Sequence, residues 1–331
     1  MKHSFNNKTI LITGGAGFIG SNVAFFIQNN YPQSNIIIFD IFRKEDINSE
    51  HNPKSFGHYK NLIGFKGNII CGDISNDDDL RSLNYYDIDY IFHFAAISNT
   101  RIYEQETIMR TNVNSFYKLL YIAKNHQAQL VYASSASVYG LSPSPQKIGN
   151  ETPNTPYGFS KYAMDQIASY FVKKNPSIKI IGLRFFNVYG EKEYFKGNTA
   201  SMIIQLGHQI LACKKPRLFN ESDKIMRDFV YIKDVVKACI LASNSQRSGI
   251  YNIGSGMDRS FQNIVEILQK ELNTDLSISY FENPYQEYQI DTRADISLSQ
   301  EFLNYTPSYN LEEGIKDYLP YIKETFKWIS K

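Results

Sequence analysis

The sequence lacks the features of secreted and membrane-embedded proteins. It has only 3 cysteines in 331 residues, and Cys71, Cys213 and Cys239 are too widely spaced for a disulfide framework or a paired metal site. It has no stretch of roughly 18 consecutive apolar residues, and its polar N-terminus is unlike a signal peptide. We therefore expect buried thiols, no bound metal, no membrane segment and a cytoplasmic location.

An excess of charge of one sign is also missing. The chain has 35 basic and 33 acidic residues and a formal net charge of +2, without the basic stripe that binds a nucleic-acid backbone. Nucleic acid is therefore not expected as a partner. The length and the 43% of hydrophobic residues suffice for two domains, or for one large domain with a smaller lobe, and they argue against disorder.

Apolar runs alternate with helical patterns along the first part of the chain. In chain order, the expected elements are strands at 9–13, 35–39, 68–71, 90–94, 129–133 and 178–184, with helices that include 19–28, 107–123 and 160–173. The strands are apolar on both faces, as in a parallel sheet covered by helices on both sides. The sequence therefore predicts an α/β fold, a Rossmann-type doubly wound parallel sheet.

The regular alternation ends after the strand at 178–184. The later segments hold an amphipathic helix at 200–212, two further helical segments and a short strand near 277–280, with polar loops between them. We predict a dinucleotide-binding domain made of residues 1–186 plus 229–258. Residues 187–228 plus 259–331 would form a smaller α+β substrate-binding lobe.

A glycine-rich segment closes the first strand and opens the first helix. Gly14, Gly17 and Gly20 stand where the backbone must approach a pyrophosphate and where the helix must pack on the strand. The N-terminus of the helix, with Phe18 and Ile19, would then face the phosphates. This segment predicts a site for a nicotinamide dinucleotide.

The residues after the second and third strands bear on which dinucleotide binds. Asp40 ends the second strand about 20 residues after the last glycine, where a carboxylate can accept the adenosine ribose hydroxyls of NAD. Arg43 and Lys44 follow, and they could hold the 2′-phosphate of NADP or be solvated loop charges. Asp73 would flank the adenine or cap the next helix. Both cofactors therefore stay open.

A tyrosine and a lysine at the start of the helix at 160–173 form a candidate acid–base pair. Tyr157 and Lys161 are four residues apart and share a helix face, so the ammonium is expected to lower the pKa of the tyrosine. Ser135 lies in a serine-rich turn at the carboxyl edge of the sheet and would hydrogen-bond the reacting oxygen. Tyr170 and Lys174 have the same spacing further along the helix, and we interpret them as structural.

These motifs together resemble the extended short-chain dehydrogenase/reductase family, in particular its nucleotide-sugar epimerases and dehydratases. Four later segments are similar to the ADP-glycero-manno-heptose 6-epimerases: residues 183–190, 196–202, 216–219 and 227–234. The stretch that begins at Lys196 is the most specific of these. A 4,6-dehydratase usually has an Asp-Glu pair where this chain has Ala136 and Ser137, which argues against dehydration.

The resemblance implies a reaction by transient oxidation. Tightly bound NAD or NADP, with NADP slightly favoured, would take hydride from C6″ of the heptose and return it to the opposite face, for lipopolysaccharide or other surface-glycan synthesis. The family's two acid–base groups fall on Tyr157 and Lys196, although a surface lysine or a phosphate contact is the alternative for Lys196. Another nucleotide-sugar epimerase, such as a 4-epimerase, is the alternative function. A binding protein without turnover need not keep Tyr157, Lys161 and Ser135 together.

The resemblance also implies contact residues and a homo-oligomer. The cofactor contacts fall on the glycine-rich segment, Tyr157, Lys161 and the positions Phe18, Ile19, Asp40, Asp73, Ile74, Ala95, Ala96 and Asn112. The substrate contacts fall on Ser98, Asn99, Ser135, Asn187, Lys196, Asn198, Gln205, Phe219, Asn220, Glu221, Ser222, Arg227 and Tyr288. Three residues depart from the family pattern near the expected sugar site: Arg101, Gln205 and Glu287.

Overall fold

The computed structural model describes residues 4–43, 55–283 and 289–329, and its largest element is a parallel sheet of seven strands. In chain order the strands are β1 Thr9–Thr13, β2 Asn35–Asp40, β3 Asn68–Cys71, β4 Tyr90–His93, β5 Gln129–Ser135, β6 Ile180–Phe185 and β10 Gly249–Ile253. Their order across the sheet is β10-β6-β5-β4-β1-β2-β3. The order reverses between β1 and β4, which is where open sheets of this kind bind ligands. The predicted Rossmann-type fold is confirmed.

Helices cover both faces of this sheet. Ile10 and Ile12 of β1 share a core with α1 Phe18–Asn30 and α7 Ile232–Ala242, whereas Leu11 packs on the other face with α4 Ser115–His126 and α5 Pro156–Lys174. Successive side chains of a strand point to opposite faces, so an unbroken apolar run fills both cores. Shorter elements complete this part of the chain: α2 Asp77–Arg81, α9 Ser297–Leu303, and α3 Gln105–Ile108, which continues through a π-helical turn at Met109–Asn114 into α4.

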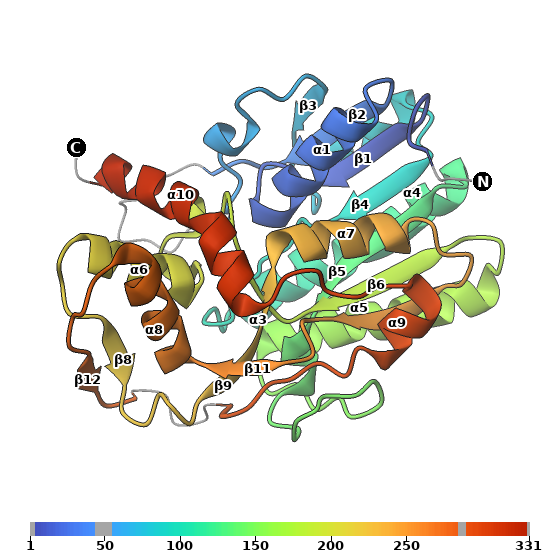
Figure 1. Ribbon diagram of the computed structural model, residues 1–331. Helices are drawn as coiled ribbons and strands as arrows, with labels where there is room; N and C mark the ends of the chain where they lie inside the picture. The colour runs from blue at the N-terminus through green and yellow to red at the C-terminus, as the bar shows by residue number, and fades with distance from the viewer. Residues whose placement is uncertain (1–3, 44–54, 284–288, 330–331) are drawn as a thin grey trace.

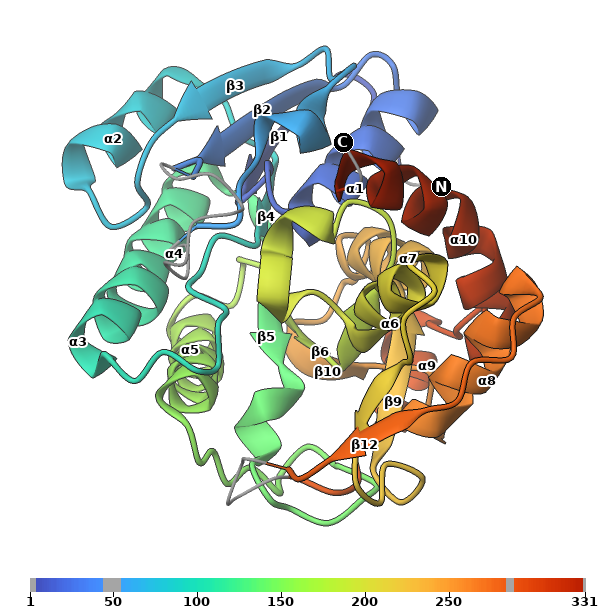
Figure 2. The same cartoon turned by 90° about the vertical axis from the view of Figure 1, so that its left-hand side faces the viewer.

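Two small sheets and three helices lie to one side of the main sheet (Figures 1 and 2). β7 Asn187–Tyr189, β9 Met226–Tyr231 and β11 Asp258–Ser260 form one sheet, and β8 Arg217–Phe219 pairs with β12 Ser279–Phe281 in the other. The helices are α6 Met202–Leu211, α8 Phe261–Leu272 and α10 Leu311–Ile329. β9 runs directly into α7, which packs on α1, so one core is continuous from the small sheet to the large one.

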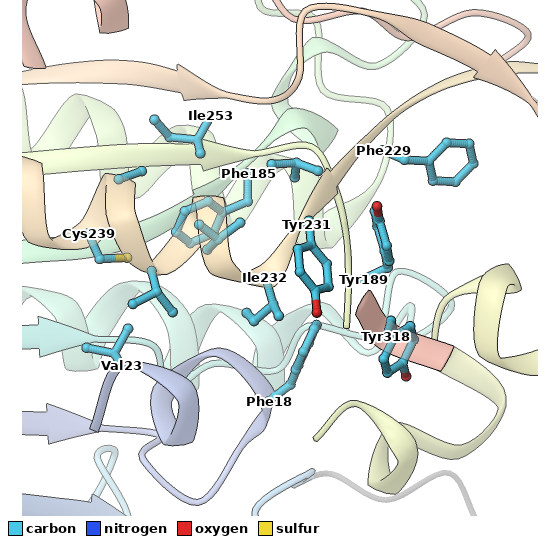
Figure 3. Packing of buried hydrophobic residues seen from close by; sticks show 14 of the residues in the cluster. Phe18, Val23, Phe185, Tyr189, Phe229, Tyr231, Ile232, Cys239, Ile253 and Tyr318 are labelled. Atoms are coloured by element: carbon cyan, nitrogen blue, oxygen red, sulfur yellow. The ribbon is translucent and has the colours of Figure 1, made fainter. Parts of the chain in front are cut away.

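Aromatic side chains fill the core where these parts meet. The ring centres of Tyr189 and Tyr231 are 5.2 Å apart, and Tyr318 of α10 lies 6.4 Å from Tyr189. Figure 3 shows this group close to Phe18, the first residue of α1. Buried aromatic rings contribute much apolar area to packing. They fix the smaller part of the molecule against the N-terminus of α1.

The cysteines differ from the expectation of buried thiols. All three are free, but only Cys239 is buried, and the prediction is wrong for Cys71 and Cys213. Cys71 ends β3, an edge strand with exposed side chains, and Cys213 occupies a turn after α6 with a φ of 54°. Among the described residues, no helix is long and apolar enough to cross a membrane, and no group of three or more His, Cys, Asp or Glu side chains could hold a metal ion.

Candidate active site

A cleft of about 740 Å³ opens at the carboxyl ends of the sheet strands. It extends from the start of α1 across β4 and β5 to the loop between β7 and α6. Most of the site residues predicted from the sequence line it, namely Gly14, Gly17, Phe18, Ile19, Gly20, Asp40, Asp73, Ile74, Ala95, Ala96, Ser98, Ser135, Tyr157, Lys161, Asn187, Lys196 and Arg227. The cleft therefore contains residues from both the large sheet and the smaller part of the molecule.

The glycine-rich turn has the shape of a phosphate cradle. Gly14 has a φ of 70°, and a Cβ atom there would approach the Ala95 nitrogen at 2.6 Å. A Cβ on Gly20 would meet the carbonyl oxygen of Gly14. Gly17 is the N-cap of α1 and makes no side-chain cap, so the first amides of the helix lie at the cleft. A helix N-terminus with open amides attracts phosphate, so a dinucleotide fits this turn.

The Asp40 carboxylate has a role that the sequence did not predict. Its oxygens accept hydrogen bonds of 2.9 Å from the amides of Ala16 and Phe42. Gly57 packs directly against it, since a Cβ on that glycine would meet the carboxylate. Burial raises the pKa of Asp40. The carboxylate therefore braces the glycine-rich turn.

The Ala16 peptide also connects this turn to the segment before β3. Its carbonyl oxygen accepts hydrogen bonds from the His58 amide at 3.0 Å and from Asn61 Nδ2 at 3.1 Å. The His58 ring stacks on the ring of Phe195 with a centroid distance of 3.7 Å, and Lys192 Nζ donates to the Asn61 carbonyl at 3.0 Å. The cofactor turn and the loop that holds Lys196 thus contact the same short segment.

Ser135, Tyr157 and Lys161 meet at the end of β5. Lys161 Nζ donates a 2.7 Å hydrogen bond to the Ala133 carbonyl and lies 6.0 Å from the centre of the Tyr157 ring. Burial lowers the pKa of Lys161 to about 8, and Asp165, one turn further along α5, opposes this shift. Burial raises the pKa of Tyr157, while its hydrogen bond with Ser135 lowers it. The expected lowering of the Tyr157 pKa by Lys161 is not among these effects.

Tyr170 has the surroundings expected of a structural residue. It is 60% exposed on α5, and Lys174 lies over its ring at 5.8 Å. It does not line the cleft.

Lys196 lies in a short helical turn, Tyr194–Thr199, between β7 and α6. Its Nζ is 5.4 Å from the centre of the Phe18 ring, at the start of α1. Burial lowers the pKa of Lys196, and the charge of Glu193 opposes this effect. An amine with a lowered pKa loses its proton more readily than an exposed lysine does.

Several predicted contact residues do not line the cleft. The Asn112 side chain bonds to both the N–H and the C=O of Ile97 and to Ser160 Oγ, so it fixes the loop after β4. Gln205 donates to the Ala200 carbonyl. The other predicted contact residues that do not line the cleft are Arg43, Asn99, Asn198, Phe219, Asn220, Glu221 and Ser222. Arg101, which departs from the family pattern, does not line it either. Lys44, Glu287 and Tyr288 lie outside the described residues.

Two of the polar predictions make structural contacts. Asp73 accepts hydrogen bonds of 2.7 Å from the amide and the hydroxyl of Ser75, while the N-cap of α2 is Asn76. The Arg227 guanidinium binds the carbonyl oxygens of Met226, Gln289 and Ile290. Both side chains remain in the cleft lining.

Other lining residues escaped the sequence analysis. Thr107, Arg110 and Thr111 reach the cleft from the turn before α4, and Phe229 and Phe261 reach it from β9 and α8. The segment 55–57, just after an undescribed stretch, also lines it. Phe229 lies in the family-like segment 227–234, but the others belong to no motif, and hydrophobic periodicity predicts a helix or strand without showing which of its side chains reach a cleft.

Comparison with known proteins agrees with this geometry. The model of the NAD dependent epimerase/dehydratase family matches residues 10–254. An ADP-L-glycero-D-manno-heptose-6-epimerase from Brachyspira hyodysenteriae is 34% identical over 328 residues, covering 96% of this chain and 98% of that protein. The crystal structure of the ADP-L-glycero-D-manno-heptose-6-epimerase of Helicobacter pylori is 45% identical, with a TM-score of 0.88 over 98% of both chains.

A more distant solved structure has the same architecture. The UDP-N-acetylglucosamine 4-epimerase of Methanobrevibacter ruminantium is 26% identical, with a TM-score of 0.85 over 97% of this chain and 99% of that one. The family match and the two heptose-epimerase relatives extend over both the sheet and the smaller part of the molecule. This chain is an epimerase that belongs to the NAD dependent epimerase/dehydratase family, in the branch that includes the ADP-L-glycero-D-manno-heptose-6-epimerases.

Proposed function

We propose that this enzyme inverts C6″ of ADP-glycero-manno-heptose and so converts the D-glycero sugar into the L-glycero sugar. One observation carries the proposal: Tyr157, in the first turn of α5 beside the large sheet, and Lys196 of the smaller part line the same cleft. Inversion through a ketone needs a proton-transfer group for each orientation of the sugar. The names of the two closely similar relatives support this substrate.

Tyr157, Ser135 and Lys161 would serve one face of the reacting carbon. Bound nicotinamide dinucleotide supplies hydride acceptance and return. Ser135 holds the sugar oxygen by a hydrogen bond, and Tyr157 exchanges a proton with that oxygen. Lys161, held by the Ala133 carbonyl, would help to hold the cofactor and would supply positive charge beside Tyr157.

Lys196 would serve the opposite face. The lowering of its pKa by burial favours proton exchange with the sugar. Arg227 would bind the diphosphate, since a guanidinium fork matches phosphate oxygens. Accordingly, we infer that residues 1–186 plus 229–258 bind the cofactor and that residues 187–228 plus 259–331 bind the sugar nucleotide.

For the cofactor, we infer a preference for NADP over NAD. Both Asp40 carboxylate oxygens accept hydrogen bonds from backbone amides, those of Ala16 and Phe42, so this side chain offers less to the ribose hydroxyls than an unbonded carboxylate would. Mass spectrometry of the nucleotide released from the purified protein tests this inference. Release of NAD alone would contradict it.

We also infer a cytoplasmic homo-oligomer. The three thiols are free, which fits a reducing compartment. Tyr117 and Tyr121 on α4 and Phe159 and Tyr170 on α5 are large exposed side chains on adjacent helices, as expected of a surface buried between subunits. Sedimentation analysis of the purified protein tests this, and a monomer at micromolar concentration would contradict it.

The proposed reaction is tested by proton NMR of ADP-D-glycero-β-D-manno-heptose with purified enzyme and no added cofactor. The expected result is a mixture of the two C6″ epimers, because the oxidised nicotinamide is regenerated in each cycle. A parallel assay under the same conditions supplies UDP- and GDP-hexoses, to test for 4-epimerase activity. Inversion of C4″ in a hexose without inversion of C6″ in the heptose would assign the enzyme to the 4-epimerases instead.

A further inference from the structure

One buried carboxylate holds the two ends of the loop that carries Lys196. Glu193 has no exposed surface. Its Oε1 accepts hydrogen bonds from the Gly190 amide at 3.1 Å and the Ser201 hydroxyl at 2.7 Å, and its Oε2 accepts one from the Ser201 amide at 2.6 Å. Gly190 follows β7 and Ser201 precedes α6. The loop between them is therefore closed on the Glu193 side chain.

Backbone contacts place Lys196 within this closed loop. The Lys196 amide donates to the Glu193 carbonyl at 2.9 Å, and the Thr199 hydroxyl donates to the Lys196 carbonyl at 2.8 Å. Gly197 has a φ of 56°, which turns the chain immediately after the lysine. Within the described parts of the chain, the Lys196 ammonium has no hydrogen bond or ion pair of its own. The loop backbone is thus what directs this side chain to the cleft.

The charge of Glu193 acts on the same ammonium. Burial lowers the pKa of Lys196, and the Glu193 carboxylate opposes that shift by stabilising the charged amine. In return, burial raises the pKa of Glu193, while Lys196 lowers it. Each buried group therefore favours the ionised form of the other.

Other titratable groups face the loop from the elements packed on it. Tyr189 comes from β7, Tyr231 from β9, and Tyr318 and Tyr321 from α10; Figure 3 shows the first three gathered beside Phe18. Burial raises the pKa of all four, so they remain neutral near pH 8. Other titratable groups beside the loop include His58, stacked on Phe195, His208 of α6, whose ring lies 6.1 Å from that of Tyr194, and the loop's own Glu191, Lys192 and Tyr194.

We propose that Glu193 is a positioning residue for Lys196: its hydrogen bonds to Gly190 and Ser201 close the loop that places this lysine at the cleft. This inference rests on the proposed function, in which Lys196 exchanges a proton with the sugar. A carboxylate used only for packing would hold the loop but would leave the titration of Lys196 unaffected.

Competitive acetylation with acetic anhydride measures the titration of Lys196 without any turnover. The full-length enzyme is labelled over a range of pH, and peptide mass spectrometry separates Lys196 from Lys192 and the exposed lysines. In Glu193→Gln we expect the Lys196 midpoint to fall, with about a tenfold larger ratio of free amine to ammonium at a given pH, equivalent to about one pKa unit. Glu191→Gln, which removes an acid from the same loop, should leave the midpoint unchanged. An unchanged midpoint in Glu193→Gln would overturn the inference.

Turnover separates this inference from the proposed function. Both Glu193→Gln and Glu193→Asp are expected to lower kcat about tenfold with KM changed less than about twofold, because positioning acts on the chemical step. Glu193→Asp keeps the charge, so its Lys196 midpoint should stay nearer to that of the wild type. A wild-type enzyme that fails to epimerise the heptose sinks the proposed function but leaves the labelling result standing. If Glu193→Gln does not fold, a folded Glu193→Asp with wild-type kcat overturns the positioning role.

Discussion

The amine of Lys161 is hydrogen-bonded to the carbonyl oxygen of Ala133 at 2.7 Å, inside the protein and beside the Tyr157 ring. A carbonyl of strand β5 therefore replaces water as a partner of the Lys161 ammonium, and the loss of hydration destabilises the charged form of the amine. Burial lowers the pKa of Lys161 from 10.5 to about 8. Between these two values the unfolded chain binds more protons than the folded chain, so the free energy of unfolding rises with pH across that window.

We predict that this contribution can be measured against Lys161→Met. The unfolding free energy of the wild type minus that of the variant should increase by about 2 kcal/mol between about pH 7.5 and about pH 10. Urea unfolding followed by circular dichroism gives both values, and the subtraction removes the other titrating groups. A constant difference over this range would mean that the amine is not desolvated in the folded chain.

Tyr157→Phe should lower kcat about 100-fold, the usual effect of losing a general acid–base group. The hydroxyl is the only group removed, and the ring packing of this 8% exposed residue is retained. Heptose turnover by NMR measures the effect. Tyr170→Phe is the matched control, because it has the same spacing to a lysine on the same helix but lies outside the cleft. Equal rates for the two variants would remove the role of Tyr157.

Lys196→Met should lower kcat by about the same factor, because one orientation of the sugar loses its proton-transfer group. Lys215→Met, at an exposed position after α6, is the control. Wild-type turnover in Lys196→Met would leave the lysine with a binding role at most.

Gly14→Ala should prevent cofactor binding and destabilise the fold by more than about 2 kcal/mol, because the φ of 70° is unfavourable for alanine and the new Cβ would overlap the backbone at Ala95. Gly64→Ala is the control that tests the effect of a positive φ alone. Its φ is 87°, but its nearest neighbour, the Phe25 ring, is 3.9 Å away. Thermal unfolding and retention of the nucleotide on gel filtration should separate the two variants. Equal losses would refute the steric argument.

A buried ion pair beneath the serine turn gives a prediction about stability alone. Arg184 Nε binds Asp165 Oδ2 at 2.9 Å with both side chains buried, and Asp165 also accepts hydrogen bonds from Ser134 and Tyr132. Asp165→Asn should cost about 3 kcal/mol or more, because the buried Arg184 guanidinium would lose one of its two carboxylate partners, Asp165 and Glu151.

The control for burial is Asp78→Asn, which removes the acid of the exposed ion pair with Arg81. We expect it to lower the free energy of unfolding by less than about 1 kcal/mol. Urea unfolding of both variants supplies the comparison. Similar losses for the two pairs would contradict the difference in burial.

The motifs of the large sheet could be predicted because each has a local cause. The glycines of the first turn, the apolar strands and the Tyr157 spacing are all visible over a few residues, and the structure places Gly14, Ser135, Tyr157 and Lys161 in one cleft. Lys196 was found through the family resemblance, since no local pattern brings this loop to the start of α1.

Other parts depended on contacts between distant segments. The role of Asp40 depends on where the Ala16 amide and Gly57 lie, and the direction of the Lys161 ammonium depends on the Ala133 carbonyl. Asn112 looked like a ligand contact, but its amide is used by the Ile97 backbone. Polar side chains near a ligand site can bind either the ligand or the chain, and composition does not distinguish the two.

The shared carbonyl of Ala16 limits how this enzyme can be recombined with its relatives. His58 and Asn61 bind that carbonyl, His58 also stacks on Phe195, and Lys192 binds the Asn61 carbonyl. A chimera that exchanges the smaller part of the molecule but keeps the native residues 58–61 would place a foreign loop against a segment that packs on the native loop. Residues 58–61 and 191–196 should therefore be exchanged together, although they would lie on opposite sides of the proposed domain boundary.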